Sequence, residues 1–79
     1  TNAELQLLIT LLEHFPLAVC RERLFREQLN REYDGTDRTI DGRASRLRKK
    51  LQAVDPRWNI RNVWGQGYSI SVNAAGDAG

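Results

Sequence analysis

The spacing of apolar residues changes once along this chain, after Asp55-Pro56. Before that point apolar residues recur every three or four positions, as they do in amphipathic helices. After it they alternate with polar residues in two segments, and Gly65 and Gly67 lie between these segments. Glycines two positions apart between alternating segments are typical of a β-hairpin. The pattern therefore predicts an α+β fold, in which a three-helix bundle precedes one C-terminal β-hairpin.

Three segments have helical periodicity and are predicted as helices: residues 2–14, 21–30 and 38–53. The first has apolar residues at the i, i+3, i+4 and i+7 positions, which predicts a buried stripe. The residues of that stripe are Leu5, Leu8, Ile9 and Leu12, widened by Leu7 and Leu11. Pro16 is expected to end this helix. Thr36 or Asp37 is expected to cap the third.

The third predicted helix separates its apolar residues from its basic ones. On a helical wheel of about 100° per residue, Ala44, Leu47 and Leu51 fall within about 40° of Ile40. The region between about 180° and 300° forms one broad outward face. It carries Thr39, Gly42, Arg43, Arg46, Lys49 and Lys50. Asp41 and Arg48 fall together on another flank, where we expect them to pair with each other.

The net charge of +2 is unevenly distributed along the chain. Residues 1–36 include four basic and six acidic residues, whereas residues 37–64 include eight basic and three acidic residues. A concentrated basic face is an electrostatic footprint for a polyanion, and the major groove of DNA admits one helix. A basic run can also be a solvated helix face, but its segregation from the apolar stripe favours nucleic-acid binding. Helices followed by a basic-flanked hairpin are typical of a winged helix.

Length and composition exclude several classes of protein. A chain of 79 residues fits one domain with a small core, and no group of residues in it suggests a catalytic site. His14 and Cys20 are the single histidine and cysteine, so no metal site, cofactor or internal disulfide is expected. No segment approaches the roughly 20 apolar residues of a membrane helix, and no signal peptide is visible. We therefore expect a cytoplasmic protein that is not an enzyme and does not contact a membrane.

Four short motifs, taken in order, closely resemble one protein family. They are DRTID at residues 37–41, SRLRKKL at 45–51, IRNV at 60–63 and GQGY at 65–68. In this combination they resemble the OmpR/PhoB family, the winged-helix output domains of bacterial two-component response regulators. The resemblance covers residues 1–72. It implies a winged helix-turn-helix domain that binds double-stranded DNA and regulates transcription.

The resemblance implies DNA contacts along the third helix, which would lie in the major groove. Arg38 and Arg43 would lie near phosphates at the start of the helix, and Arg46 would reach base edges. With Thr39 on the outward face, the expected DNA-binding residues of this helix are Arg38, Thr39, Arg43, Arg46, Lys49 and Lys50.

The same resemblance implies two further contact segments. The wing, residues 60–72, would touch the DNA backbone or minor groove through Asn62 and Trp64. Strand alternation points Trp64 outward if Val63 points inward, and the alternative is that Trp64 folds back onto Tyr68 or Ile60. The loop 30–37 resembles a segment that contacts RNA polymerase. The expected contact residues there are Tyr33, Asp34, Gly35 and Thr36.

The sequence departs from the family pattern at several positions. Gly42 and Ala44 stand where bulky aliphatic residues are usual, and a glycine within a helix costs about 1 kcal/mol relative to alanine. Cys20 stands where a serine-like cap is common, and we expect it to be small, buried and a poor cap. Trp64 replaces an arginine of the wing. We do not expect the N-terminal sheet and receiver domain of the family in this chain, which is interpreted as a domain of residues 1–72 with a flexible tail, 73–79.

Two functions from different classes remain open at this point. The first is sequence-specific binding of double-stranded DNA, as the output domain of a bacterial transcription regulator. The second is a winged-helix module whose basic face binds an acidic protein partner. For the first, the resemblance implies tandem dimers on direct repeats, with RNA polymerase as a further partner. We expect a monomer in free solution.

Overall fold

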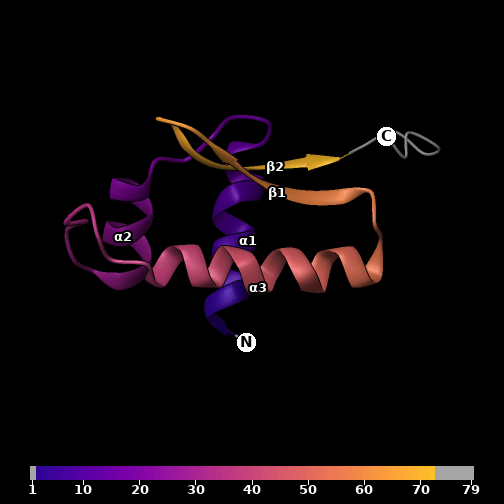
Figure 1. The fold of residues 1–79 in the computed structure, drawn as a ribbon, viewed down its shortest axis with the longest axis horizontal. Coiled ribbons are helices and arrows are strands. Elements are labelled where there is room, and N and C mark those ends of the chain that lie inside the picture. The colour runs from indigo at the N-terminus through magenta and orange to yellow at the C-terminus, as the bar shows by residue number, and fades with distance from the viewer. Residues whose placement is uncertain (1, 73–79) are drawn as a thin grey trace.

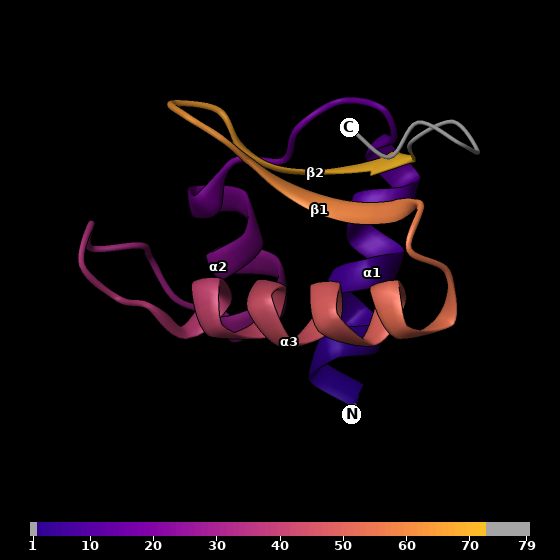
Figure 2. The same ribbon diagram turned by 45° about the vertical axis from the view of Figure 1, so that its right-hand side comes forward.

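The computed structural model describes residues 2–72, which form three helices followed by a two-stranded sheet. The elements are α1 (Asn2–His14), α2 (Arg21–Leu29), α3 (Thr39–Val54), β1 (Trp58–Val63) and β2 (Gly67–Val72). The hairpin lies along one side of the molecule, α3 lies along the other, and α1 reaches from the hairpin to α3 (Figure 1, Figure 2). This arrangement confirms the predicted three-helix bundle with a C-terminal wing. The expected tail, residues 73–79, lies outside the described residues.

The helix boundaries agree with the predicted ones to within one residue. Asn30 adopts the left-handed backbone conformation, φ 54°, and ends α2. The Asp37 carboxylate accepts hydrogen bonds from the backbone N–H of Thr39, at 2.9 Å, and from its hydroxyl, at 2.6 Å. The N-cap residue of α3 is Arg38, which makes no side-chain cap hydrogen bond. The expectation that Thr36 or Asp37 is the N-cap is therefore wrong, although Asp37, one position earlier, binds the N–H of Thr39. Cys20 makes no side-chain cap to α2, also as expected, but the prediction that it is buried is wrong, because it is exposed.

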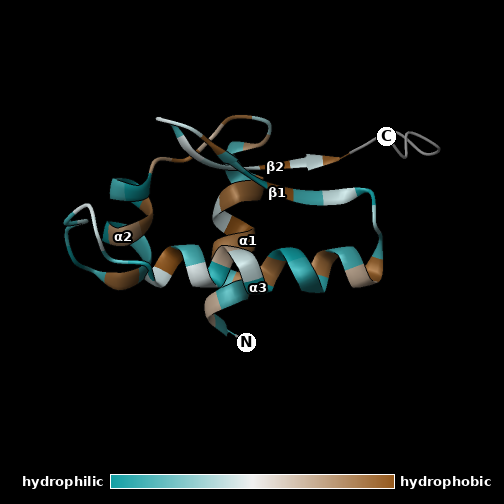
Figure 3. Ribbon diagram, viewed as in Figure 1, coloured by the Kyte–Doolittle hydropathy of each residue, from teal (hydrophilic) through white to brown (hydrophobic). Residues whose placement is uncertain are grey.

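The buried side of α1 differs from the predicted stripe. Leu7 and Leu11 are fully buried, whereas Leu5, Ile9 and Leu12 are 50%, 42% and 45% exposed. The helix is apolar on more than one side (Figure 3), so its pattern does not specify which side faces the core. Contacts with α3 and β2 select the side that carries Leu7 and Leu11.

One hydrophobic core joins all five elements. Its buried residues beyond those of α1 are Val19, Leu24, Phe25, Ile40, Ala44, Leu47, Ile60, Tyr68 and Ile70. The predicted apolar stripe of α3 is confirmed, since Ile40, Ala44 and Leu47 are buried and the half-buried Leu51 packs against the core. With this side of α3 covered, its opposite side faces away from the molecule.

The hairpin is anchored to the helices by the connector between α1 and α2. The strands are antiparallel, with Ile60 opposite Ile70. Val19 in the connector donates its N–H to the Tyr68 carbonyl at 2.8 Å and accepts the Tyr68 N–H at 3.0 Å. Gly67, at φ +119°, allows this approach, because a Cβ there would lie 1.9 Å from the Val19 oxygen. The wing is therefore fixed at its base rather than free to swing.

Candidate nucleic-acid interface

The outer face of α3 carries most of the residues for which we predict DNA contacts. Arg46, Lys49 and Lys50 are exposed, and Thr39 and Arg43 are half-buried. The helix presents them because its apolar stripe, Ile40 to Leu51, is turned toward the core. The result is a row of cations along the solvent side of one helix.

Two of these cations also contact α1. Glu4 is only 4% exposed, and its Oε1 lies 2.7 Å from Lys50 Nζ. Its Oε2 lies 4.0 Å from Arg46 Nε. The hydrogen bond with Glu4 raises the pKa of Lys50. More than half of each basic side chain remains exposed, so both stay accessible to a polyanion while they tie α3 to α1.

Arg43 lies on the flank of α3 that faces α1 and α2. It lines a shallow pocket with residues of both helices, including Gln6 and Gln28. The wing lies beside the opposite flank, where Gln52 Nε2 of α3 donates to Asn59 Oδ1 of β1 at 3.3 Å. Arg43 therefore lies on the side of α3 away from the wing.

The expected ion pair between Asp41 and Arg48 is wrong. Asp41 Oδ1 instead accepts from Arg21 at 3.3 Å, and its Oδ2 accepts from Arg38 Nε at 3.1 Å. Helical periodicity placed Asp41 and Arg48 on the same flank but carried no information about Arg21, which comes from a different helix. Arg38 remains 85% exposed despite this contact.

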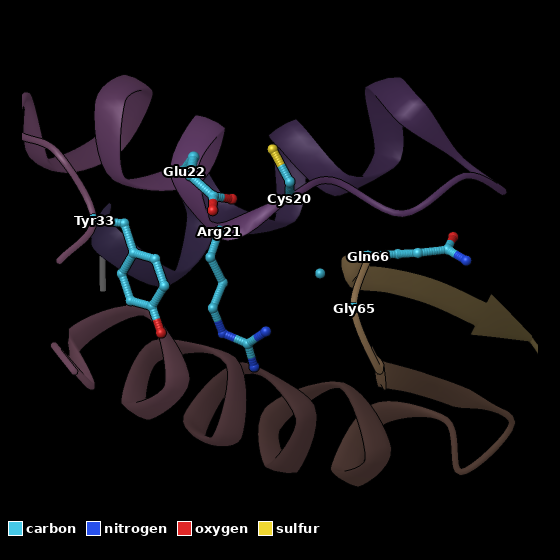
Figure 4. A pocket seen from close by; sticks show the side chains of 7 residues that line it. Cys20, Arg21, Glu22, Tyr33, Gly65 and Gln66 are labelled. Atoms are coloured by element: carbon cyan, nitrogen blue, oxygen red, sulfur yellow. The ribbon is translucent and has the colours of Figure 1, made fainter. Parts of the chain in front are cut away.

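Arg21, Asp41, Asn62 and Tyr68, here called the Arg21 cluster, join α2, α3 and the hairpin. Arg21 extends from the start of α2 toward α3 (Figure 4). Its Nη2 donates to Asn62 Oδ1 at 3.2 Å and to the Tyr68 hydroxyl at 3.3 Å. The Tyr68 hydroxyl donates in turn to Asp41 Oδ1, and the Arg21 guanidinium carbon lies 4.8 Å from the Tyr68 ring centre. Burial and the bond to Asp41 raise the pKa of Tyr68.

The sequence predicted no role for Arg21, and it assigned Arg48 to an ion pair with Asp41 and not to the DNA-binding residues. One signal for Arg21 was available: a cation in the first turn of a helix is unfavourable for the helix dipole, which suggests a partner elsewhere. Arg48 is exposed, one helical turn before Gln52, which bonds to Asn59 of the wing. Because Asp41 is paired with Arg21 and Arg38, Arg48 is not held in the expected ion pair.

The wing exposes Trp64 at its tip. This side chain is 95% exposed, which contradicts the alternative that it folds back onto Tyr68 or Ile60. A turn directs it outward: the Gln66 N–H donates to the Val63 carbonyl at 2.9 Å, and Gly65 has φ +76°. An indole in water has no packing role, so it is available to a partner.

The loop before α3 is ordered by its own side chains. The Asp34 carboxylate accepts the backbone N–H groups of Thr36, at 2.8 Å, and Asp37, at 2.9 Å. These bonds lower the pKa of Asp34. The Tyr33 ring lies 4.8 Å from the ring of Phe25 in the core, while Asp34, Gly35 and Thr36 are exposed. The three exposed residues therefore form a defined surface turn.

Residues 2–72 meet the requirements of neither a metal site nor a membrane-spanning helix. No group of three or more His, Cys, Asp or Glu side chains there could hold a metal ion. None of the helices in this part of the chain is long and apolar enough to cross a bilayer.

Comparison with known sequences decides the family. Residues 1–70 match the model of the family described as transcriptional regulatory protein, C terminal. The chain belongs to this family. The resemblance to OmpR/PhoB-type output domains of response regulators is thereby confirmed over almost the whole described chain, and this is a family of DNA-binding regulatory domains.

The curated proteins that this chain resembles include response regulators. The heme response regulator HssR of Staphylococcus aureus, from strains JH9, Newman and NCTC 8325, is 33% identical to this chain over 69 residues. The aligned residues are 87% of this chain and 31% of the relative. The chain thus spans about a third of the length of these response regulators.

Proposed function

We propose that this domain binds double-stranded DNA sequence-specifically, with α3 in the major groove and the wing on the backbone or minor groove. The observation that carries the proposal is the exposed cationic side of α3 beside a wing that the Arg21 cluster holds in place. A major groove about 12 Å wide admits a single helix, and a fixed wing then reaches the adjacent backbone. Arg46 supplies the base contact, and the other cations contact phosphates.

The relatives extend the proposal to regulation. HssR is named as a response regulator, so we propose that this chain serves as the output domain of a two-component system. The ordered turn at Asp34 to Thr36, with Tyr33 beside it, is the proposed contact for RNA polymerase. Two copies would occupy direct repeats in tandem on DNA, and the free domain would be a monomer.

A salt titration tests DNA binding. Each phosphate neutralised lowers the slope of log K against log salt by about 0.9, so binding to a duplex is expected to weaken steeply as salt rises. An acidic protein partner held by a packed interface would respond less. Duplex binding that hardly changes between low and moderate salt would contradict the proposal and favour the protein-binding function.

Two variants on α3 test how the contacts are divided. Arg46→Ala is expected to cost about 1–3 kcal/mol on the specific site and to relax discrimination there. Lys49→Ala, an exposed cation on the same helix, is expected to weaken all duplexes equally and to reduce the salt slope by about 1. If both variants lower specific and random binding in parallel, Arg46 does not contact bases.

A further inference from the structure

The Arg21 cluster fixes the orientation of a side chain on the wing. Asn62 lies opposite Tyr68 in the hairpin and is exposed, while its Oδ1 lies 3.2 Å from Arg21 Nη2. A guanidinium has five N–H donors and no acceptor. The atom of the Asn62 amide that faces Arg21 must therefore be the oxygen, because the NH2 group would face another donor.

Arg21 is held in place by contacts other than Asn62. Its Nε and Nη2 both donate to Asp41 Oδ1 at 3.3 Å. Its guanidinium also packs over the Tyr68 ring, at 4.8 Å. A planar fork bound to a carboxylate and stacked on an aromatic ring has little freedom to turn. The orientation of Asn62 is therefore imposed by the cluster and does not depend on a ligand.

We infer that Asn62 presents an N–H donor, and not an acceptor, to DNA, so that the wing recognises a hydrogen-bond acceptor at this point. The inference rests on the proposed DNA binding. With Oδ1 directed at Arg21, the Nδ2 group is the part of the amide left for a ligand. Two acceptors on DNA fit it: a phosphate oxygen, and the adenine N3 or thymine O2 edge of the minor groove. The guanine N2 amino group is a donor and does not fit.

A pair of variants tests the inference. Asn62→Asp keeps the shape and still accepts from Arg21, but replaces the outward donor with a carboxylate oxygen. Asn59→Asp is the matched control, because it adds the same charge to the same strand, where Gln52 Nε2 already donates to Asn59 Oδ1 at 3.3 Å. Duplex affinity, salt slope and thermal midpoint are measured for both variants and for Asn62→Ala.

The expected result is a specific loss of affinity without loss of fold. Asn62→Asp is expected to bind duplex DNA at least about tenfold more weakly than Asn59→Asp, with an unchanged or raised thermal midpoint. Asn62→Ala, which removes the donor without adding charge, is expected to lose about fivefold. Equal losses in Asn62→Asp and Asn59→Asp would overturn the inference while leaving DNA binding intact. A wild-type domain that binds no duplex would overturn the proposed function itself.

Modified duplexes distinguish the two acceptors. If the partner is a phosphate, a neutral methylphosphonate at one backbone position weakens wild type by a larger factor than it weakens Asn62→Ala. If the partner is a base edge, replacing an A·T pair by G·C under the wing has that effect instead. Either result supports an outward donor. If no phosphate or base-pair change under the wing separates wild type from Asn62→Ala, Asn62 does not contact DNA and the inference fails.

Discussion

At the scale of single residues, Gly42 and Gly67 differ in what a methyl group would meet. A Cβ at Gly42 would have Arg46 Nη1 as its nearest neighbour, at 3.4 Å, which is ordinary contact. A Cβ at Gly67 would overlap the Val19 carbonyl, in a backbone conformation that side chains rarely adopt. The fold would therefore accept a larger residue at position 42, whereas it requires glycine at position 67.

Gly42→Ala and Gly67→Ala, made separately, are expected to change the free energy of unfolding in opposite directions. Gly42→Ala is expected to raise the free energy of unfolding by up to about 1 kcal/mol, because alanine favours the helix. Gly67→Ala is expected to lower it by at least about 2 kcal/mol, because the pairing of Val19 with Tyr68 must open. Thermal or denaturant melts measure both changes.

The Gly42→Ala variant also shows whether the glycine serves binding. If the backbone of α3 must approach DNA closely at this position, the stabilised variant loses affinity. Unchanged affinity would identify Gly42 as a tolerated defect in the helix. A Gly67→Ala variant as stable as wild type would contradict the close approach between the connector and β2.

Substitutions of Trp64 test whether this exposed aromatic side chain contributes to DNA binding. Because it is 95% exposed, Trp64→Ala is expected to change the free energy of unfolding by less than about 0.5 kcal/mol and to weaken DNA or tandem binding. Trp64→Arg is expected to bind duplexes more tightly, with a salt slope steeper by about 1, because the guanidinium adds a phosphate or minor-groove contact. Normal binding by Trp64→Ala would remove this residue from the interface.

At the scale of elements, the start of α3 depends on a carboxylate. The hydroxyl and N–H of Thr39 donate to Asp37 and lower the pKa of that carboxyl below its ordinary value of 3.8. A lowered pKa means that the folded state favours the charged form. The stabilisation is therefore complete above the ordinary pKa and is lost as the pH falls through the lowered one.

Melts between about pH 7 and about pH 3 measure this dependence. Asp37→Asn keeps an acceptor for the N–H of Thr39 but removes the titrating carboxyl, so the variant is expected to lose less stability in acid than wild type. Asp55→Asn is a positive control, because Arg57 lowers the pKa of Asp55 to about 2 at the other end of α3. Its removal is also expected to reduce the loss of stability in acid, while it leaves the Asp37 carboxylate intact. Identical acid profiles for wild type and Asp37→Asn would show that the Asp37 carboxylate does not control the stability of α3.

At the scale of the whole molecule, the Tyr68 hydroxyl is shared by three elements. It belongs to β2, donates to Asp41 of α3 and accepts from Arg21 of α2. Tyr68→Phe keeps the buried ring and is expected to lower the free energy of unfolding by about 1–2 kcal/mol, because two charged groups lose a partner. Tyr33→Phe, on a half-buried ring packed against Phe25, is the control and is expected to have a smaller effect.

The same variant tests whether the wing must be held in place for DNA binding. Tyr68→Phe at a temperature where it remains folded is expected to bind DNA more weakly than Tyr33→Phe, because the wing is less firmly fixed against α3. Unchanged affinity together with reduced stability would assign the hydroxyl to folding alone.

The sequence by itself determined the elements, their order and the two sides of α3. Helical and strand periodicity are local properties, so residues 2–72 could be divided into helices and strands to within one residue at the helix ends. On α3, apolar and basic residues are sharply separated, and burial of Ile40, Ala44 and Leu47 leaves the cations outside whatever the partner elements are. The bond from the Thr39 N–H to Asp37 is likewise decided within a few residues, although the N-cap itself is Arg38 and not the expected Thr36 or Asp37.

Only the tertiary structure decided which side of α1 is buried and which groups pair across elements. A helix with leucines on several sides fits more than one packing, and contacts with α3 and β2 selected Leu7 and Leu11. Two of the three partners of Asp41, Arg21 and Tyr68, lie 20 and 27 positions away from it in sequence. No periodicity relates residues so far apart in sequence, because their meeting depends on how complete elements pack against one another.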